Sequence, residues 1–348
     1  CCMAEVVFPL AGLDLARAFG DQRRIPMLNG VYGRTTRDCL NVRGYDTFGR
    51  ARGGTRPGLV KYVSSAVVAD WIIQGLGLVV STGTGMQTSN SGRVVTLVTI
   101  SQGNVYSLQA GATTWTTATN DTGRAHPLNY TGIIQMTSLN QKMYFADGQN
   151  WCVFDPSTTT VSTMTPTAGS LPADSSGNLP RLCCTWRGRL VYSGVLYDPH
   201  NFFMSRVSTP LDFDYFPTTI TPDQAVAGNS GALGLVGDVV TALVPLSDDR
   251  LLMGCDHELH MLAGDPMAGG QIDRITDSVG MAWGAPHCMD PSGNVYFLSN
   301  RMRVYRMEPG GKPVPISQQI DKRLQAFNTG DVTIRLGWDD VNTGLCVF

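Results

Sequence analysis

Two histidines three residues apart, His257 and His260, form the cluster whose side chains could bind a metal ion. On a helix they would share one face, and imidazole nitrogens are common zinc ligands. The flanking segments Leu251–Met253 and Leu259–Leu262 instead have the apolar character of strands, and residues three apart on a strand point to opposite faces. The sequence therefore favours a polar hairpin turn between two strands, and no metal site is expected.

Carboxylates are the other groups that could act in catalysis. Asp212-Phe213-Asp214 resembles a fragment of a calcium loop, but the following glycine and the distal glutamate are absent. Glutamate occurs only at positions 5, 258 and 308. Two aspartates could still pair in a glycosidase, which leaves a propeller hydrolase as the least favoured alternative. There is no Gly-x-Ser-x-Gly elbow, Walker loop or dinucleotide fingerprint, so the sequence predicts neither an enzyme nor a cofactor.

A group of arginines near the N-terminus is the better functional candidate. Through residue 60 the chain carries 9 basic and 5 acidic residues, against 17 and 23 in the remainder. The surrounding glycines cannot sustain a helix, so we expect an extended arm. Its guanidinium groups could pair with carboxylates of a neighbouring subunit, face DNA phosphates or remain in water, and contact with a subunit or adaptor is favoured. The arginines are Arg34, Arg37, Arg43, Arg50, Arg52 and Arg56.

The composition limits the elements that could position these groups. Gly and Pro together make up 58 of 348 residues, and only 16% of residues are charged, against about 25% in typical soluble domains. This balance disfavours helix bundles, coiled coils and disorder, and the net charge of −2 excludes a generally basic nucleic-acid binder. No apolar stretch approaches the ~20 residues of a membrane span, and no signal peptide is visible. The nine cysteines contain no CxxC, so we expect mainly buried free thiols from a reducing compartment.

Short apolar strands, each preceded by a polar turn, recur from about residue 66 onward. A hairpin unit repeating every ~40 to 50 residues is the signature of a propeller blade. The sequence therefore predicts an all-β fold, a β-propeller over residues 66–348 with an extended N-terminal arm over residues 1–65 and a few short helices; a sandwich or β-helix is the alternative. One helix is predicted from Ile316 to Phe327, with Ser317 as its cap, and the last blade is expected to be incomplete at Phe348. The anchors of the repeat are Val105, Met143, Leu190, Leu251, Val295 and Leu345, at intervals of 38, 47, 61, 44 and 50.

Three groups of segments carry a resemblance to a known family. The first group is Asn41–Asp46 with Gly49–Leu59; the second is Trp186–Val191, Ser205–Val207 and Asp212–Asp214; the third is His260–Pro266, Thr276–Gly280 and Asp290–Leu298. These segments resemble a family of virion proteins, the tail nozzle or tubular tail proteins of short-tailed bacteriophages. The resemblance extends from residue 29 to about residue 325 and consists of scattered patterns.

The resemblance implies a structural protein of the phage tail, assembled in the host cytoplasm. Its subunits would form a ring, usually hexameric, below the portal and adaptor proteins, with sites for tail-fibre proteins. The ring would enclose the channel through which DNA passes without sequence-specific binding, and the family offers no catalytic residues to carry over. By analogy, residues 34–58 would thread between subunits or reach the adaptor. The alternative from another class is a receptor- or glycan-binding propeller of the tail tip or a fibre.

Overall fold

The computed structural model describes most of the chain after residue 72. The described residues are 73–82, 92–120, 128, 132–228, 233–284, 286–318, 320–326, 334–339 and 344–347, with residues 63, 66 and 67 and four short N-terminal strands. The N-terminal strands form two antiparallel pairs: β1 (Arg24–Pro26) with β2 (Tyr32–Arg34), and β3 (Val42–Arg43) with β4 (Gly54–Thr55).

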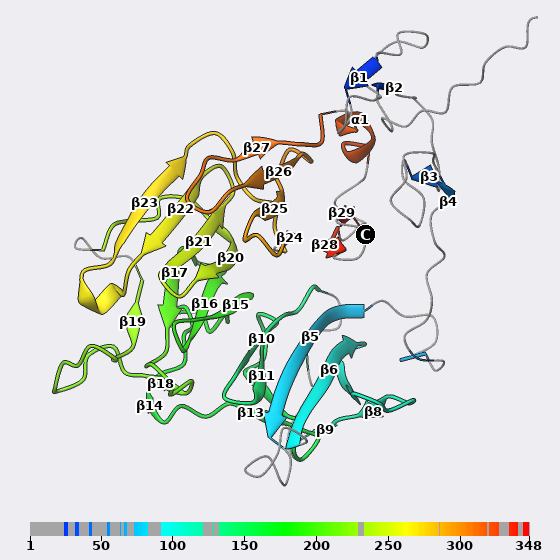
Figure 1. Ribbon diagram of the computed structural model, residues 1–348. Coiled ribbons are helices and arrows are strands. Elements are labelled where there is room, and N and C mark those ends of the chain that lie inside the picture. Colours follow the sequence, from blue (N-terminus) through cyan, green and yellow to red (C-terminus); the bar gives the residue numbers. More distant parts are fainter. Residues whose placement is uncertain are drawn as a thin grey trace, which may run out of the picture.

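Most of the remaining described chain folds into five successive sheets of mainly antiparallel strands (Figure 1). The first sheet contains β5 (Ile73–Thr82), β6 (Arg93–Ser101), β7 (Asn104–Gln109) and β8 (Thr116–Thr117). The second contains β10 (Gln135–Leu139), β11 (Lys142–Ala146), β12 (Cys152–Asp155) and β13 (Thr160–Thr163), with β9 (Thr119–Asn120) parallel to β13. The third contains β15 (Leu182–Trp186), β16 (Arg189–Val195), β17 (Asp198–Met204) and β19 (Val226–Ala227).

Two further four-stranded sheets continue the series. The fourth contains β20 (Val240–Ser247), β21 (Arg250–Cys255), β22 (Leu259–Ala263) and β23 (Gln271–Thr276). The fifth contains β24 (His287–Met289), β25 (Val295–Leu298), β26 (Val304–Met307) and β27 (Val314–Pro315). A two-stranded sheet of β28 (Leu336–Asp339) and β29 (Gly344–Val347) follows the fifth, and a short parallel pair joins β14 (Ala168–Gly169) to β18 (Asp212–Phe213).

The sheets are arranged as blades around a common axis, so the fold is all-β and of the propeller type. Each blade is a meander of adjacent strands, and the first strands of several successive blades lie side by side: β5 with β10, β10 with β15, and β15 with β20 (Figure 1). A separate apolar cluster fills the space between each pair of neighbouring blades, for example Val98 with Phe145 and Phe202 with Leu251. Burial of apolar side chains between blades therefore holds the arc together.

Turn residues fix the register of the first strands. Asn140 and Gln141, between β10 and β11, both have positive φ, as do Arg187 and Gly188 between β15 and β16. Two successive residues with positive φ form the type I′ turn that matches the right-handed twist of a hairpin. In β5, Gly77 allows close packing on the second sheet, because a Cβ there would lie 2.7 Å from the Met136 sulfur.

The predicted repeat is correct in kind but wrong in one anchor. Met143, Leu190, Leu251, Val295 and Leu345 all lie on the second strand of their sheet, whereas Val105 lies on β7, the third strand of the first sheet. The equivalent strand is β6, which begins at Arg93. The first interval is therefore longer than 38 residues, because β6 precedes β7 in the chain.

The predicted helix is much shorter than expected. The α-helix α1 covers only Asp321–Leu324, and the half-exposed Ile316 continues the pairing of β27 by donating its N–H to the carbonyl of Val304, 3.0 Å away. The Ser317 hydroxyl accepts from the N–H of Val304 at 2.9 Å and lies 2.6 Å from a carboxylate oxygen of Asp321. Ser317 therefore joins α1 to β26 through its side chain.

The expected free thiols are confirmed for the cysteines whose side chains the structure describes. Cys152, Cys183, Cys184 and Cys255 are buried, Cys288 is half-buried, and all five are unbridged. Burial raises the pKa of the Cys184 thiol and of the Cys255 thiol. These side chains therefore act as small apolar core residues. Among the described residues, no helix is both long enough and apolar enough to cross a bilayer.

Candidate assembly surface and axial pocket

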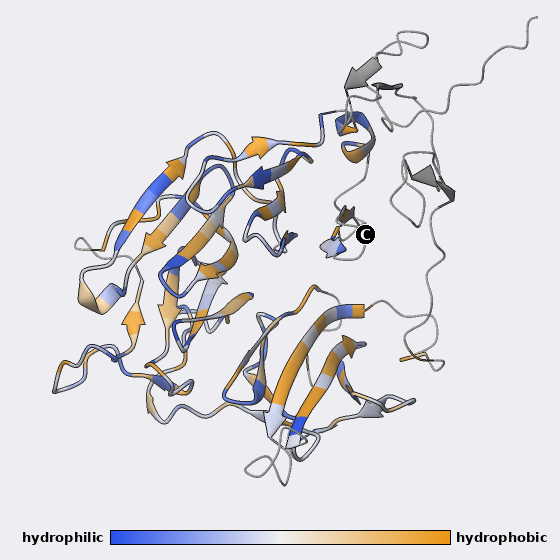
Figure 2. Cartoon of the chain, viewed as in Figure 1, coloured by the Kyte–Doolittle hydropathy of each residue, from blue (hydrophilic) through white to orange (hydrophobic). Residues whose placement is uncertain are grey.

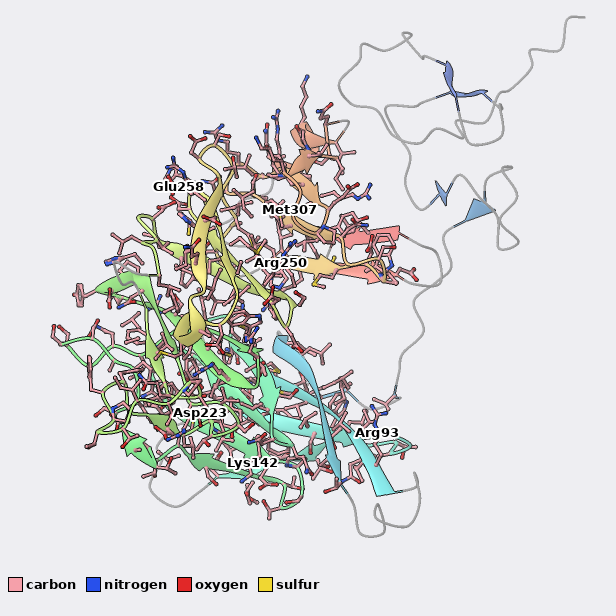
Figure 3. All side chains as sticks on the ribbon, turned by 60° about the vertical axis from the view of Figure 1, so that its left-hand side comes forward. Arg93, Lys142, Asp223, Arg250, Glu258 and Met307 are labelled. Carbon is pink, nitrogen blue, oxygen red and sulfur yellow. The ribbon has the colours of Figure 1, made fainter. Side chains whose placement is uncertain are left out.

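The two histidines lie on a hairpin, as the sequence predicts. His257 is in the turn between β21 and β22, whereas His260 is buried within β22 and its Nε2 lies 2.8 Å from a carboxylate oxygen of Glu258. Glu258 also accepts from Arg274 at 3.0 Å. These contacts form a local network of the fourth sheet, and Figure 3 shows Glu258 far along the arc from Lys142 of the second sheet. Within the described part of the chain, no group of three or more His, Cys, Asp or Glu residues is placed to hold a metal ion.

The acidic segment Asp212–Asp214 has a structural role in the third blade. Asp212 begins β18, is buried and accepts the N–H of Asp214 at 3.0 Å. Arg206 lies 3.7 Å from the Asp212 carboxylate and donates from Nε to Asp223 at 2.8 Å. The hydrogen bond from Arg206 lowers the pKa of Asp223 to about 2. The segment therefore fixes a loop of the third blade.

The arginine arm falls largely outside the described residues. Arg34 is the last residue of β2 and Arg43 the last of β3, and the structure describes only their backbone. Arg37, Arg50, Arg52 and Arg56 lie outside the described residues. Contact of this arm with a subunit or adaptor therefore stays a prediction.

Arg189, at the start of β16, is fully buried and joins the third and fourth blades. Its Nη1 donates to the carbonyls of Ser205, at 3.0 Å, and Gln224, and its Nη2 donates to the carbonyl of Pro222 at 3.2 Å. The carboxylate of Asp265, from the fourth blade, lies 3.7 Å from Nη2. Burial lowers the pKa of Arg189, and the nearby carboxylates Asp265 and Asp223 oppose that shift.

Further contacts at this junction come from Trp186 and Arg187, close to Arg189 in the sequence. Arg187, two residues before Arg189, also lies 3.5 Å from Asp265, and the indole Nε1 of Trp186 donates to the carbonyl of Ser247 at 2.8 Å. The segments Trp186–Val191 and His260–Pro266 therefore meet at the junction of two blades.

The first blade carries an apolar face that the other described residues leave exposed. Leu76, Leu78 and Val80 alternate along one side of β5 and have exposed fractions of 61%, 58% and 39%. On the neighbouring strand β6, their register partners are Thr99, Leu97 and Val95 in that order. Leu97 and Val95 are only half-buried. Figure 2 shows apolar residues along both strands at this end of the arc. The opposite side of β5, including Val79, packs on the second blade. Contiguous exposed apolar faces are a common feature of surfaces that contact another protein, a membrane or a ligand.

A cavity of about 350 Å³ lies at the axis, where the first strands of several blades begin. Gln135 contributes from the start of β10, Asp147 and Gln149 from the turn after β11, and Arg181 from the segment before β15. Trp283 comes from the segment before β24. Gln135 donates from Nε2 to the carbonyl of Gly284 at 2.8 Å, which holds this segment against the second blade.

Two loops of the pocket are built to present polar side chains. The carboxylate of Asp147 accepts the N–H groups of Gln149 and Asn150 at 2.9 and 2.7 Å and the side-chain amide of Asn150 at 2.9 Å. Gly148, with a φ of +77°, packs against the Arg181 side chain and donates its N–H to the carbonyl of Pro180 at 3.1 Å. Sequence reasoning missed this pocket because its residues come from distant blades.

No family model matches the chain, and no curated protein matches it. Solved structures with a similar arrangement include the extracellular domain of a hybrid two-component system from B. thetaiotaomicron, with 10% identity and a TM-score of 0.48 over 81% of this chain and 31% of that one. PorZ, a surface component of the type-IX secretion system of Porphyromonas gingivalis, has 15% identity and a TM-score of 0.41 over 64% of this chain and 25% of its own.

A third similar structure is Hsv2 of Kluyveromyces lactis, with 11% identity and a TM-score of 0.38 over 72% of this chain and 85% of that one. The chain spans about a third or less of the length of the first two proteins. The class that the blades of this chain define is the all-β propeller type.

Proposed function

We propose that the chain is a structural subunit of a bacteriophage tail nozzle, in which copies form a ring around the DNA exit channel and provide docking sites for tail fibres. The observation that carries the proposal is the exposed apolar row of Leu76, Leu78 and Val80 on the first blade. Leaving such a row in water is unfavourable, and each fully buried Leu or Val side chain contributes about 1.5–3 kcal/mol. A neighbouring copy that covers this row would stabilise the assembly.

The geometry of such a contact suits a ring. The row lies at one end of the arc of blades, and we propose that a different surface of the next copy covers it. A contact between two different surfaces generates a closed ring when the rotation between copies closes. The family resemblance suggests a hexamer, with the portal-adaptor and tail-fibre proteins as further partners and DNA passing through the lumen without sequence-specific contacts.

The experiment that tests this function is detection of the chain in purified virions. Peptides of the chain should be found by mass spectrometry, and electron microscopy of particles carrying a tag on the chain should place the tag on a ring below the portal. Host membranes from the same lysate serve as the control. Recovery of the chain only outside virions would contradict the proposal.

The arginine arm gives a second test of the ring. If Arg52 and Arg56 contact a neighbouring copy, changing both to Ala should weaken ring assembly in sedimentation velocity and leave the melting temperature of the monomer nearly unchanged. Changing Arg93, an exposed arginine at the start of β6, to Ala is the matched control. An equal loss of monomer stability would show that the arm arginines stabilise the fold of their own chain instead.

A further inference from the structure

The axial pocket has the size and side-chain composition of a small-ligand site. Its volume of about 350 Å³ lies at the lower end of the ~300–1,000 Å³ of such sites. The pocket combines an aromatic surface, Trp283, with polar side chains from two other blades, Gln149 and Arg181. The ring of copies proposed above makes no use of these groups.

Trp283 provides a flat apolar platform at the edge of the pocket. Its exposed fraction is 45%, whereas Trp186 in the core is only 2% exposed. The indole rests on Gly194, a bulge residue of β16 with a φ of +74°, where a Cβ would lie 3.2 Å from the ring. Because Gly194 has no side chain, the indole can pack directly on the backbone of β16. An exposed tryptophan face can pack against the C–H groups on one side of a sugar ring, while its N–H and the surrounding polar groups meet hydroxyls.

Arg181 supplies a positive charge beside this platform. Its side chain is exposed, and its guanidinium takes part in none of the hydrogen bonds or ion pairs found among the described residues. The side chain lies against Gly148, where an added Cβ would come within 2.9 Å of Nε. The planar fork of a guanidinium matches a carboxylate in a two-bond geometry.

Asp147 contributes a carboxylate to the lining of the same pocket. The hydrogen bonds of its carboxylate to Gln149 and Asn150 hold it in its own turn, and it is only 5% exposed. Its negative charge partly offsets that of Arg181. A singly charged carboxylate therefore suits the pocket better than a phosphate of higher charge, which Asp147 would repel more strongly.

We infer that the axial pocket binds a sugar ring that carries a carboxylate, with the ring packed on Trp283, the carboxylate on Arg181 and hydroxyls near Gln149. This inference does not depend on ring assembly, because every residue it uses belongs to one copy.

The test is a titration with methyl β-D-glucuronide and with methyl β-D-glucoside, which has the same ring but a hydroxymethyl group in place of the carboxylate. The indole N–H signal of Trp283, assigned by its loss in Trp283→Phe, reports binding in NMR spectra of the full chain. The glucuronide should shift this signal with an affinity at least about tenfold above that of the glucoside, which is the effect of one charge-assisted contact.

Variants of the two key residues separate the parts of the inference. Arg181→Gln should reduce the affinity for the glucuronide to that of the glucoside, whereas the control Arg93→Gln should leave both unchanged. Trp283→Ala should abolish binding of both sugars, as seen in ligand-observed saturation transfer, and Gly194→Ala should weaken both by displacing the indole. Circular dichroism melting identifies the variants that remain folded.

Three results would overturn the inference. Equal affinity for the two sugars would show that the pocket does not recognise the carboxylate. The absence of any shift at Trp283 up to tens of millimolar sugar would show that the pocket does not bind a sugar. Tighter binding of deoxycytidine monophosphate than of the glucuronide would assign the platform and the arginine to a nucleotide instead.

Discussion

The junction between the third and fourth blades and the open face of the first blade are both made by neighbouring strands of the same propeller, yet they differ in every other respect. At the junction, Arg189 is fully buried and donates to carbonyls of a loop in its own blade, while Asp265 approaches it from the next. On the first blade, Leu76 and Leu78 remain more than half exposed.

The two surfaces differ in how their apolar and polar groups are covered. The junction combines an apolar cluster that includes Phe202 and Leu251 with polar contacts at its rim, so neither side needs a further partner. The face of β5 has the apolar residues of a blade junction, but no blade among the described residues covers it. We infer that the junction stabilises the chain itself and that the face of β5 stabilises its assembly.

The largest effect is expected from breaking the junction at Arg189. Arg189→Met retains much of the side-chain volume but leaves the buried carbonyls of Ser205 and Gln224 without the donor that Arg189 provides. The free energy of unfolding should fall by about 3 kcal/mol or more, because each buried unsatisfied group costs about 1–3 kcal/mol. Urea unfolding followed by tryptophan fluorescence measures this loss. Arg274→Met, at the exposed edge of the fourth blade, is the control. An equal loss of stability in Arg274→Met would show that the buried hydrogen bonds of Arg189 do not account for the effect.

A smaller effect is expected from titrating Asp223, at the edge of the same junction. Its hydrogen bond from Arg206 lowers its pKa from 3.8 to about 2 in the folded chain. The contribution of Asp223 is therefore fully present above pH 4 and is lost as the pH falls toward 2. Because the pair is exposed to solvent, the contribution is modest and is screened by salt.

Asp223→Asn should make the stability of the chain less dependent on pH between 4 and 2, with little change at pH 7 in 1 M salt. Thermal melting at half-unit pH steps measures this slope. Asp248→Asn, in the turn between β20 and β21, is the matched control. The same slope in Asp223→Asn and in the unchanged chain would contradict the role given to the Arg206 pair.

Local turn chemistry and strand alternation made the blades predictable from the sequence. The segment Asp290–Asn294, for example, forms a tight turn in which burial opposes ionisation of Asp290, but hydrogen bonds from Asn294 and Ser292 outweigh it and lower its pKa. Such a turn precedes β25 and is visible as a run of turn residues. The first anchor, at Val105, was wrong because the longer loop after β5 gives no comparable signal.

The sites were less predictable, since they depend on residues that only the fold brings together. Trp283 and Asp147 come from segments far apart in the chain and meet at the axis. The helix predicted from Ile316 failed for a related reason: the apolar spacing is helical, but pairing with β26 holds Ile316 in an extended conformation. The exposed apolar face of β5 could not be predicted from the sequence. A strand that is buried on both faces and a strand with one exposed apolar face have the same apolar sequence pattern.

The smallest effect on the monomer and the largest on assembly are expected at Leu78, at the centre of the open face. Leu78→Glu places a charge where the contact between copies requires an apolar side chain, whereas Leu78→Ile is the matched control. Because Leu78 is 58% exposed, the unfolding midpoint of the isolated chain should change little in either variant.

Sedimentation velocity of the unchanged chain, Leu78→Glu and Leu78→Ile at equal concentration tests this central claim most directly. We expect a ring-sized species in the unchanged chain and in Leu78→Ile, and a monomer that keeps its normal melting temperature in Leu78→Glu. A ring of undiminished stability in Leu78→Glu, or a monomer as destabilised as that of Arg189→Met, would show that the face of β5 is not the surface through which copies assemble.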